Sequence, residues 1–285
     1  MLETVTVMGR NVYVSRCPGA DLVVLVRLAS REGGVWNGLW QRLQGRYTLA
    51  NIDLGSPGQA ESSAGEIFKD FAHIVVDIAK TLEPRPFHIV GWTGGTQIAL
   101  QAALRHSERL ASMTLITPFR EVGDRRRLDR GLDFIETILR SGDRERYAYY
   151  WFMAGLSNEF LTKRFDEVER LVATRLAGDP FVALDVDRAM AWMRALRSDW
   201  VSSAELAEIK LPTLILGASE NHWHAGPAPE MAEALHRAIS GSAFEIFAGL
   251  GPLLLLEAPD TVADTIDRFL RIHPVSNSAR NDKKT

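Results

Sequence analysis

The stretch 88-HIVGWTGGTQIAL-100 constrains the fold more than any other part of the chain. An apolar run with strand character ends at Gly91, and a helix-forming run begins soon afterwards, at Gly95. Such a short passage from strand to helix holds its central residue, Thr93, at strained backbone angles, so the residues two positions away must be small. The stretch predicts a sharp elbow carrying Thr93, with the positive end of the helix dipole aimed at it.

Strand and helix patterns alternate along most of the chain. Short β-branched or apolar runs predict strands at TVTVMG, NVYVSR, LVVLV, YTLANID, FHIVG, MTLIT, LPTLILG and AFEIFAG. Residues 36–43 and 64–82 carry apolar side chains at helical spacing, and a further helix follows Gly95. The run LVVLV is apolar throughout, as expected of a strand covered on both faces. The alternation predicts an α/β fold with a mostly parallel central sheet and helices on both faces.

Composition argues against several classes of protein. The chain has 285 residues, a formal net charge of -3 and a pI near 6.2, so it offers no basic footprint for a nucleic-acid partner. No apolar run approaches the roughly 20 residues of a membrane span, and the N-terminal MLETVTVMGR lacks the apolar core of a signal peptide. We therefore expect a cytoplasmic protein without a membrane span. The single cysteine, Cys17, cannot form an intrachain disulfide.

The strand pattern stops between Pro118 and Leu211, where helical stretches rich in charged and aromatic residues take over. The first, DRRRLDR, is interpreted as a solvated helix face. The stretch 147-YAYYWFM-153, which contains Trp151, either packs against the sheet or forms the wall of an apolar ligand pocket. The tail is polar and expected to be disordered. The predicted domains are a core at 1–118 and 211–272, a helical cap at 119–210, and a tail at 273–285.

Four further stretches are similar to landmarks of one family. IDLGSPGQA resembles an aspartate-containing loop after an early strand, and RHSERLASMTLITP the passage from the elbow helix to the next strand. LPTLILG resembles the strand before an acid loop, and LEAPDTVADTIDRFL the terminal helix. With the elbow, they resemble the α/β-hydrolase superfamily from LVVLV to about Leu270. The resemblance implies the α/β-hydrolase fold, with the insertion at 119–210 as a cap over an acyl or other apolar substrate.

The resemblance also implies a catalytic triad, whose positions this chain fills unusually. Thr93 stands at the elbow in place of serine, a hydroxyl nucleophile whose extra methyl group crowds attack. Glu220 takes the acid position. Counting back from Glu257 puts Pro252 where the family's histidine would lie. Because proline has no side-chain proton acceptor, the resemblance implies a degenerate triad without the usual general base.

The entrance to the site departs from the family as well. Arg27 and Leu28 replace the His-Gly pair that follows the LVVLV-type strand, which leaves the Gly94 N–H as one oxyanion donor. Trp92 and Arg27 are expected to line the pocket mouth. Arg27 either binds a substrate carbonyl or carboxylate, or forms an ion pair with Asp53 or Glu220. The expected substrate-binding residues are Arg27, Leu28, Trp92, Gly94 and Trp151.

Two histidines, His222 and His224, follow Glu220 closely in the loop after a late strand. His222 is the first candidate for a relocated base that would serve the elbow. The alternative is that one histidine is exposed and the other caps the loop. Since no third metal ligand is identifiable, we expect neither a metal nor a cofactor.

Three functions remain open at this point. The leading one is an atypical α/β-hydrolase-fold enzyme for a small, largely apolar carbonyl or acyl substrate, with a reaction of lyase, cyclase or isomerase type. Gly94 and Arg27 would then polarise a carbonyl, while Glu220 and His222 move a proton. The alternatives are an ester or thioester hydrolase or acyltransferase that uses Thr93, and a non-catalytic ligand-binding or scaffold protein. The expected partner is a small apolar molecule, with a second copy of the chain left open.

Overall fold

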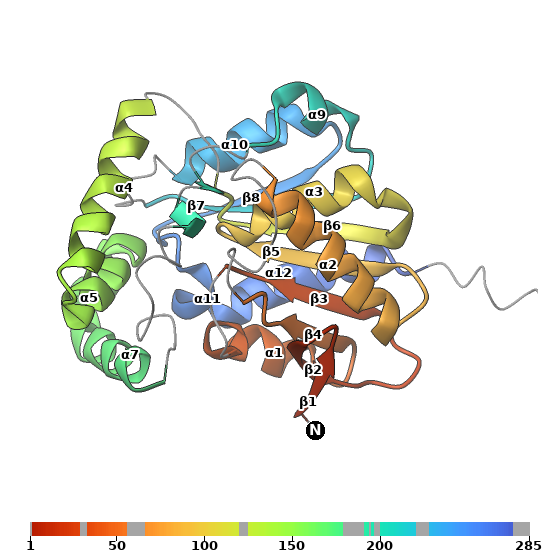
Figure 1. The fold of residues 1–285 in the computed structure, drawn as a ribbon, viewed down its shortest axis with the longest axis horizontal. Coiled ribbons are helices and arrows are strands. Elements are labelled where there is room, and N and C mark those ends of the chain that lie inside the picture. The colour runs from red at the N-terminus through yellow and green to blue at the C-terminus, as the bar shows by residue number, and fades with distance from the viewer. Residues whose placement is uncertain are drawn as a thin grey trace, which may run out of the picture.

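The computed structural model describes residues 2–28, 33–55, 66–119, 125–178, 191–193, 195–196, 200–220 and 228–275. Within these residues one 8-stranded sheet forms the centre of the molecule, in the order β1-β2-β4-β3-β5-β6-β7-β8 (Figure 1). All eight strands expected from the sequence are present. Their bounds are β1 (Leu2–Val7), β2 (Arg10–Ser15), β3 (Leu22–Val26), β4 (Thr48–Ile52), β5 (Phe87–Trp92), β6 (Leu110–Ile116), β7 (Thr213–Ala218) and β8 (Ala243–Phe247).

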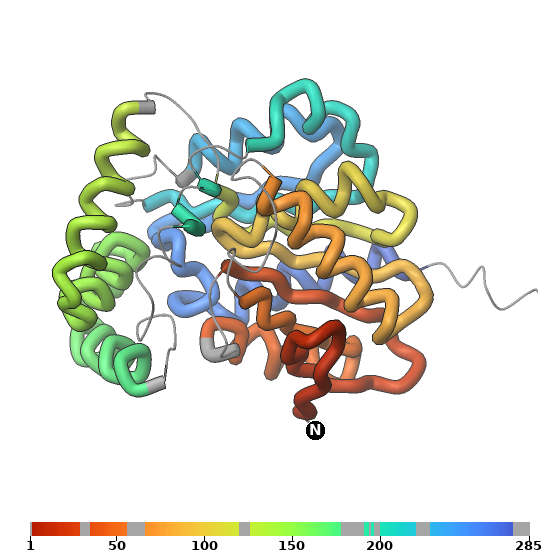
Figure 2. The backbone as a smooth tube through the Cα atoms, viewed as in Figure 1, coloured from red at the N-terminus to blue at the C-terminus, as the bar shows by residue number. Residues whose placement is uncertain are grey.

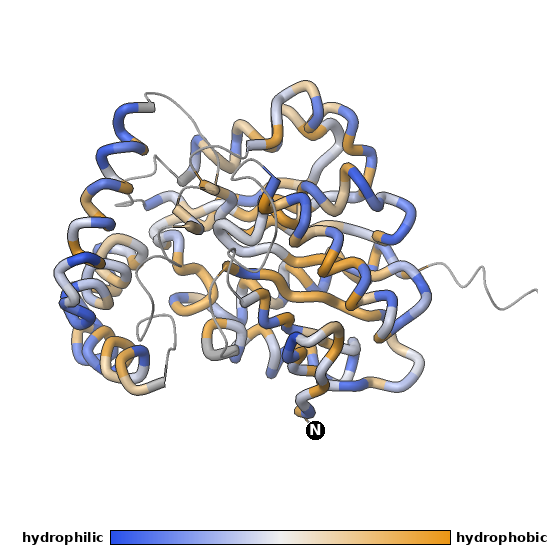
Figure 3. The backbone as a smooth tube through the Cα atoms, viewed as in Figure 1, coloured by the Kyte–Doolittle hydropathy of each residue, from blue (hydrophilic) through white to orange (hydrophobic). Residues whose placement is uncertain are grey.

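Most of the sheet is parallel, as predicted. Strands β1, β2 and β4 pair antiparallel at one edge, and every pair from β4 through β3, β5, β6 and β7 to β8 is parallel. Strand β3, the LVVLV run, is buried at all of its positions, which fits a strand covered on both faces. In Figure 3 the central strands are mostly orange, the colour of hydrophobic residues, whereas the outer helices alternate between orange and blue. The parallel strands bring their carboxyl ends to one edge of the sheet, where the elbow lies.

Helices cover one face of the sheet with the larger apolar core. They are α2 (Ile67–Leu82), α3 (Gly95–Arg105), α9 (Ser203–Glu208) and α10 (Ala228–Ala238). Helix α2 turns one apolar side inward, including Phe71, Val75 and Ile78, as its helical spacing predicts. Helix α3 is buried from Gly95 to Ala103 because it packs on β3, β5 and β6 and also against α2 and α9. The elbow is therefore followed directly by a helix that is buried along most of its length.

The opposite face is covered by η1 (Gly33–Trp36), α1 (Asn37–Leu43), α11 (Leu254–Glu257) and α12 (Pro259–Ile272). Their apolar side chains form a second core with the other sides of the strands. A short turn, η3 (Ser107–Arg109), leads from α3 into β6. Helices on both faces of a mostly parallel sheet confirm the predicted α/β architecture.

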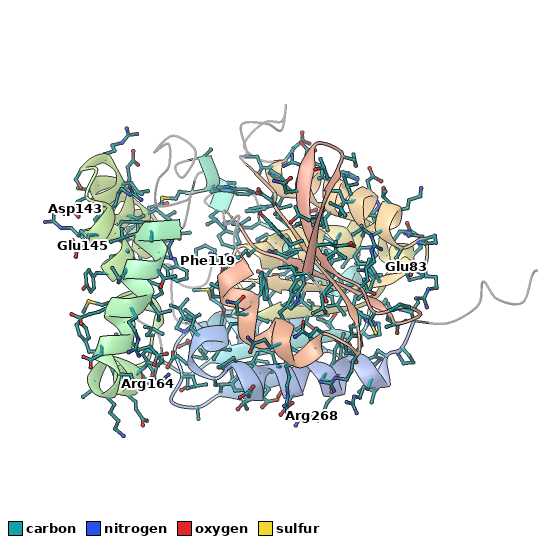
Figure 4. The ribbon with its side chains drawn as sticks, turned by 90° about the horizontal axis from the view of Figure 1, so that it is seen from below. Glu83, Phe119, Asp143, Glu145, Arg164 and Arg268 are labelled. Carbon is teal, nitrogen blue, oxygen red and sulfur yellow. The ribbon has the colours of Figure 1, made fainter. Side chains whose placement is uncertain are left out.

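Between β6 and β7 the chain leaves the sheet and forms a group of helices along one side of the molecule (Figures 1 and 2). They are α4 (Arg125–Arg140), α5 (Arg144–Gly155), α6 (Asn158–Lys163) and α7 (Phe165–Gly178). Phe119, where the chain departs from the core, lies between these helices and the sheet (Figure 4). Trp200 stacks on its ring at 5.5 Å. The helical insertion that the sequence predicts is present, and no helix among the described residues is both long and apolar enough to cross a membrane.

Candidate active site

The elbow between β5 and α3 is built as the sequence predicts. Thr93 has φ 49°, in the left-handed region that a β-branched residue rarely occupies. Its N–H donates to the Ile116 carbonyl at 3.0 Å, and its own carbonyl accepts hydrogen bonds from the Thr96 N–H and hydroxyl at 3.0 and 2.5 Å. The Thr93 backbone is thus bonded on both sides. Its hydroxyl makes no hydrogen bond to another residue in the described part of the chain.

Glycines at both ends of the elbow are required by close backbone approaches. A Cβ on Gly91 would lie 2.8 Å from the Gly95 carbonyl oxygen. A Cβ on Gly95 would lie 2.3 Å from the Val26 carbonyl oxygen and 2.8 Å from Arg27 Cα. The start of α3 therefore sits directly against the end of β3, with no room for a side chain at either glycine.

The Gly94 N–H is available to stabilise negative charge. It stands at the N-terminus of α3, and it has no acceptor among the residues that the structure describes. Backbone amides at a helix start carry the positive end of the helix dipole. Leu28 covers Gly94 closely, since a Cβ there would lie 2.2 Å from Leu28 Cδ1 and 3.5 Å from Leu196 Cδ2. The surroundings of the amide are therefore apolar, which strengthens its electrostatic effect.

An aromatic column joins the elbow strand to the helical insertion. Trp92 is 1% exposed, and its ring meets Trp36 at 6.2 Å and Trp151 of α5 at 6.0 Å, both edge to face. The Arg27 guanidinium lies 5.2 Å from the Trp92 ring centroid, and that of Arg175 lies 4.4 Å from the Trp151 ring. The structure thus brings Arg27, Trp92 and Trp151 together. The Trp92 ring itself is packed inside this column.

Glu220 directs its carboxylate at the helical insertion. Its N–H donates to the Leu250 carbonyl at 3.0 Å, and its Oε2 accepts the Asn158 N–H at 2.7 Å, at the start of α6. Asn158 is therefore a described partner of the Glu220 carboxylate, and an ion pair of Arg27 with Asp53 or Glu220 stays a prediction. His222 and His224 lie outside the described residues.

Pro252 stands in the loop between β8 and α11, close to the elbow. Its carbonyl accepts the Thr117 hydroxyl at 3.1 Å. Thr117 follows Ile116, whose carbonyl accepts the Thr93 N–H. Pro252 is therefore linked to Thr93 through two hydrogen bonds and the peptide bond between Ile116 and Thr117. Pro252 is buried and offers this part of the site a backbone carbonyl but no side-chain base.

Glu257 lies at the contact between the core and the helical insertion, and in the sequence it serves only as the marker from which Pro252 is counted. Its Oε1 accepts N–H groups from Ser157 at 3.0 Å and Gly251 at 2.9 Å, and its Oε2 accepts the Ser157 hydroxyl at 2.5 Å. Burial raises the pKa of the Glu257 carboxyl, the three hydrogen bonds oppose that rise, and the Glu220 charge adds to it. The only local signal was one acidic residue ending the apolar run LLLLE.

A Ser-His-Asp arrangement lies away from the elbow, at the amino ends of the parallel strands. Ser112 Oγ is 2.7 Å from His88 Nδ1, and His88 Nε2 is 3.8 Å from Asp21 Oδ2. Ser112 and His88 are both fully buried, so a substrate has no access to the hydroxyl. The burial of this cluster indicates a structural role. Among the described residues, no group of three or more His, Cys, Asp or Glu side chains could hold a metal ion.

Comparison with known proteins agrees with this geometry. The family model described as "Alpha/beta hydrolase family" matches residues 21–265, which is most of the chain. The chain belongs to the α/β-hydrolase family. An uncharacterized hydrolase, YugF, of Bacillus subtilis is 24% identical over 276 residues, covering 93% of this chain and 96% of the relative.

A pimeloyl-[acyl-carrier protein] methyl ester esterase of Methylococcus capsulatus is 34% identical over 94 residues, covering 33% of this chain and 35% of the esterase. The match thus spans about a third of that relative's length. Among solved structures, MGS-M2, an α/β-hydrolase enzyme from a Medee basin deep-sea metagenome library, aligns with a TM-score of 0.75 at 19% identity. That alignment covers 97% of this chain and 100% of the other. It supports the fold.

Proposed function

We propose that the chain is an ester or thioester hydrolase, or an acyltransferase, that uses Thr93 as its nucleophile. The observation that carries this proposal is the elbow: a threonine held at φ 49°, with a hydroxyl that no described group engages and the Gly94 amide beside it. The similarity to esterases favours this function over the non-hydrolytic reaction that the sequence put first. Fold similarity alone would not choose between them.

The reaction begins with attack of the Thr93 hydroxyl oxygen on the carbonyl carbon of the substrate. The C–O or C–S bond to the leaving group then breaks, and the acyl group stays on Thr93 as an ester. The Gly94 N–H stabilises the oxyanion that forms in between. Water or an acceptor alcohol or thiol attacks the acyl-threonine and restores the hydroxyl. A base must take the Thr93 proton and later give it to the leaving group, and His222 is our candidate.

The surroundings of the elbow support a largely apolar acyl substrate. Leu28 lies over Gly94, and the Trp92–Trp151 column links the elbow strand to the helical insertion. Arg27 is a charged group at this junction, and it contacts the Trp92 ring. We retain residues 119–210 as the proposed cap that covers such a substrate. A short or medium acyl chain fits apolar walls of this kind better than a charged one.

Turnover of p-nitrophenyl esters from acetate to decanoate, and of the matching acyl-CoA thioesters, tests the proposal. We expect hydrolysis with a preference for short or medium chains, and a mass increase of one acyl group on the peptide that contains Thr93 after rapid acid quenching. A label on another residue would contradict the assignment of Thr93. No turnover with any ester or thioester would contradict the hydrolase proposal itself.

His222 is expected to be essential to that turnover. Changing His222 to alanine removes the proposed proton acceptor, so kcat should fall by about 10²–10⁴-fold with little change in KM. His236→Ala is a matched control, because His236 bonds Ser242 at 2.8 Å and stacks on Phe244, away from the elbow. Equal activity in the two variants would assign the base to another group.

A second candidate is a protein that binds an apolar carbonyl compound without acyl transfer, either for a lyase, cyclase or isomerase reaction or for binding alone. Pro252 has no side-chain base, and in this alternative Glu220, whose Oε2 accepts the Asn158 N–H, is the group that moves the proton. Under this alternative Glu220→Gln abolishes turnover and Thr93→Ala retains it. Thermal stabilisation by a ligand without turnover would instead favour binding alone.

A further inference from the structure

Three segments that are distant in sequence meet beside the elbow. One is the cap corner, residues 155–158, where α5 ends and α6 begins. The second is the loop 249–253, which carries Pro252. The third is the segment directly after β7, at Ser219 and Glu220. Gly251 is pressed against the cap corner so closely that a Cβ there would lie 2.5 Å from the Gly155 carbonyl oxygen. The junction is therefore a tight contact between core and insertion.

Glu257 ties two of these segments together through one carboxyl group. Its Oε1 receives N–H groups from the cap corner, at Ser157, and from the loop, at Gly251. Its Oε2 contacts the Ser157 hydroxyl. Two further hydrogen bonds cross the same junction: Leu253 N–H to the Gly155 carbonyl at 2.9 Å, and Asn158 N–H to Glu220 at 2.7 Å. Loss of Glu257 would remove three of these five contacts.

The two carboxyl oxygens divide their partners in a way that suits a neutral acid. Oε1 accepts both backbone amides, so it can act as the carbonyl oxygen of a protonated group. Oε2 contacts only a hydroxyl, which can accept a hydrogen bond as readily as it donates one. Protonation on Oε2 would keep all three contacts with Glu257 as the donor to Ser157. It would also remove the charge repulsion from Glu220, the charged group that acts on Glu257 from the neighbouring segments.

A second glutamate in the chain, Glu205, bonds a serine in a more exposed setting. Glu205 also contacts the N–H and the hydroxyl of a serine, but there a single oxygen, Oε2, lies 2.8 Å from the Ser202 N–H and 2.6 Å from its hydroxyl. That pair forms the exposed N-terminal cap of α9, and the hydrogen bonds from Ser202 lower the pKa of Glu205. At Glu257 the corresponding bonds are outweighed by burial, which raises the pKa. The pKa values of the two glutamates are therefore shifted in opposite directions.

We propose that Glu257 is a positioning residue whose neutral form closes the cap corner onto the loop 249–253 beside the elbow, and whose ionised form loosens that junction. The part of this proposal that concerns access to Thr93 rests on the proposed function. A group with a higher pKa in the closed state binds its proton more tightly there than when solvated. Closure is therefore favoured as the pH falls, and the gain is lost as the pH rises through the closed-state pKa.

Hydrogen exchange measures this junction without any need for turnover. Protection factors of peptides covering residues 155–160 and 249–254, corrected for intrinsic exchange, would be followed from about pH 4 to pH 8. In the wild type we expect protection to fall as the pH rises, by up to about tenfold for each unit by which the closed-state pKa exceeds that of a solvated glutamate. Flat protection across this range, or protection that falls on acidification, would overturn the proposal.

Two variants at Glu257 separate charge from contact. Glutamine has the shape and hydrogen-bonding pattern of the neutral acid, so Glu257→Gln should keep the acid-like protection at every pH. Glu257→Ala should lose the protection at every pH. A glutamine variant that behaves like the alanine variant would contradict the role of the neutral form. Glu205→Gln is the matched control and should change exchange only around α9.

Kinetic constants of the same variants link the junction to the site. If the ester panel shows turnover, Glu257→Gln should abolish the pH dependence of KM between about pH 4 and pH 8 that the wild type shows, with kcat at neutral pH largely retained. A pH-dependent KM in the glutamine variant equal to that of the wild type would count against the role in access. Absence of turnover combined with the expected exchange pattern would leave the junction established and the hydrolase proposal rejected.

Discussion

Replacing Gly95 by alanine is expected to destabilise the protein by about 2–3 kcal/mol, although the residue lies in a helix. Alanine is normally favoured over glycine in a helix by about 1 kcal/mol. Here its Cβ would lie 2.3 Å from the Val26 carbonyl oxygen and 2.8 Å from Arg27 Cα, both on the backbone of the neighbouring strand end. Neither atom can turn away as a flexible side chain could, so α3 or β3 must shift. Urea unfolding followed by tryptophan fluorescence measures the change.

Gly142→Ala is the appropriate comparison for this variant. Gly142 has φ +73° and nothing within 4 Å of an added Cβ, so alanine there incurs only the cost of the left-handed backbone, about 1–2 kcal/mol. A larger loss at Gly95 than at Gly142, together with weakened ester turnover only at Gly95, would support the close packing of the elbow. If alanine at Gly95 stabilised the protein, as helix propensity alone predicts, the close packing of α3 against the end of β3 would be contradicted.

The fold could be predicted from the sequence because its signals are local. The run LVVLV is buried at every position of β3, and α2 places its apolar spacing against the sheet. Thr93 and its glycines likewise form one continuous stretch, and the strain at the elbow follows from the short passage between strand and helix. Each of these inferences uses residues that lie close together in the sequence. Local signals of this kind are enough to predict the fold, and the structure confirms it.

The roles of the acidic residues could not be predicted in this way. The contact of Glu257 with Ser157 joins positions 100 residues apart, and that of Pro252 with Thr117 joins positions 135 apart. Such contacts depend on where the insertion returns to the sheet, which no periodic pattern records. Glu220 was assigned to catalysis from its place after a late strand, yet its described partner is the Asn158 N–H. Its catalytic role, and that of His222, remain predictions.

Changing Thr93 to alanine is expected to lower kcat/KM for the best ester by about three powers of ten or more, with little change in stability. The variant keeps a Cβ at the elbow but has no hydroxyl oxygen to carry the acyl group. Any remaining rate would come from the Gly94 N–H and from substrate binding. Steady-state kinetics, with thermal unfolding of the same preparations, would check both parts. Full turnover in the alanine variant would remove Thr93 as the nucleophile and favour the non-hydrolytic alternative.

Changing Thr93 to glycine separates the cost of the elbow from its use. A non-glycine residue at φ 49° costs about 1–2 kcal/mol, and glycine removes that cost while gaining freedom in the unfolded chain worth up to about 1 kcal/mol. We expect a net gain of about 1 kcal/mol in stability alongside the same loss of turnover as in the alanine variant. Met8→Gly, at φ 50° in the exposed turn between β1 and β2, should give a similar gain with turnover unchanged. A glycine variant that is more stable but inactive would show that the threonine is needed for its hydroxyl and not for stability. A glycine variant that is less stable would show instead that the threonine side chain is needed for packing.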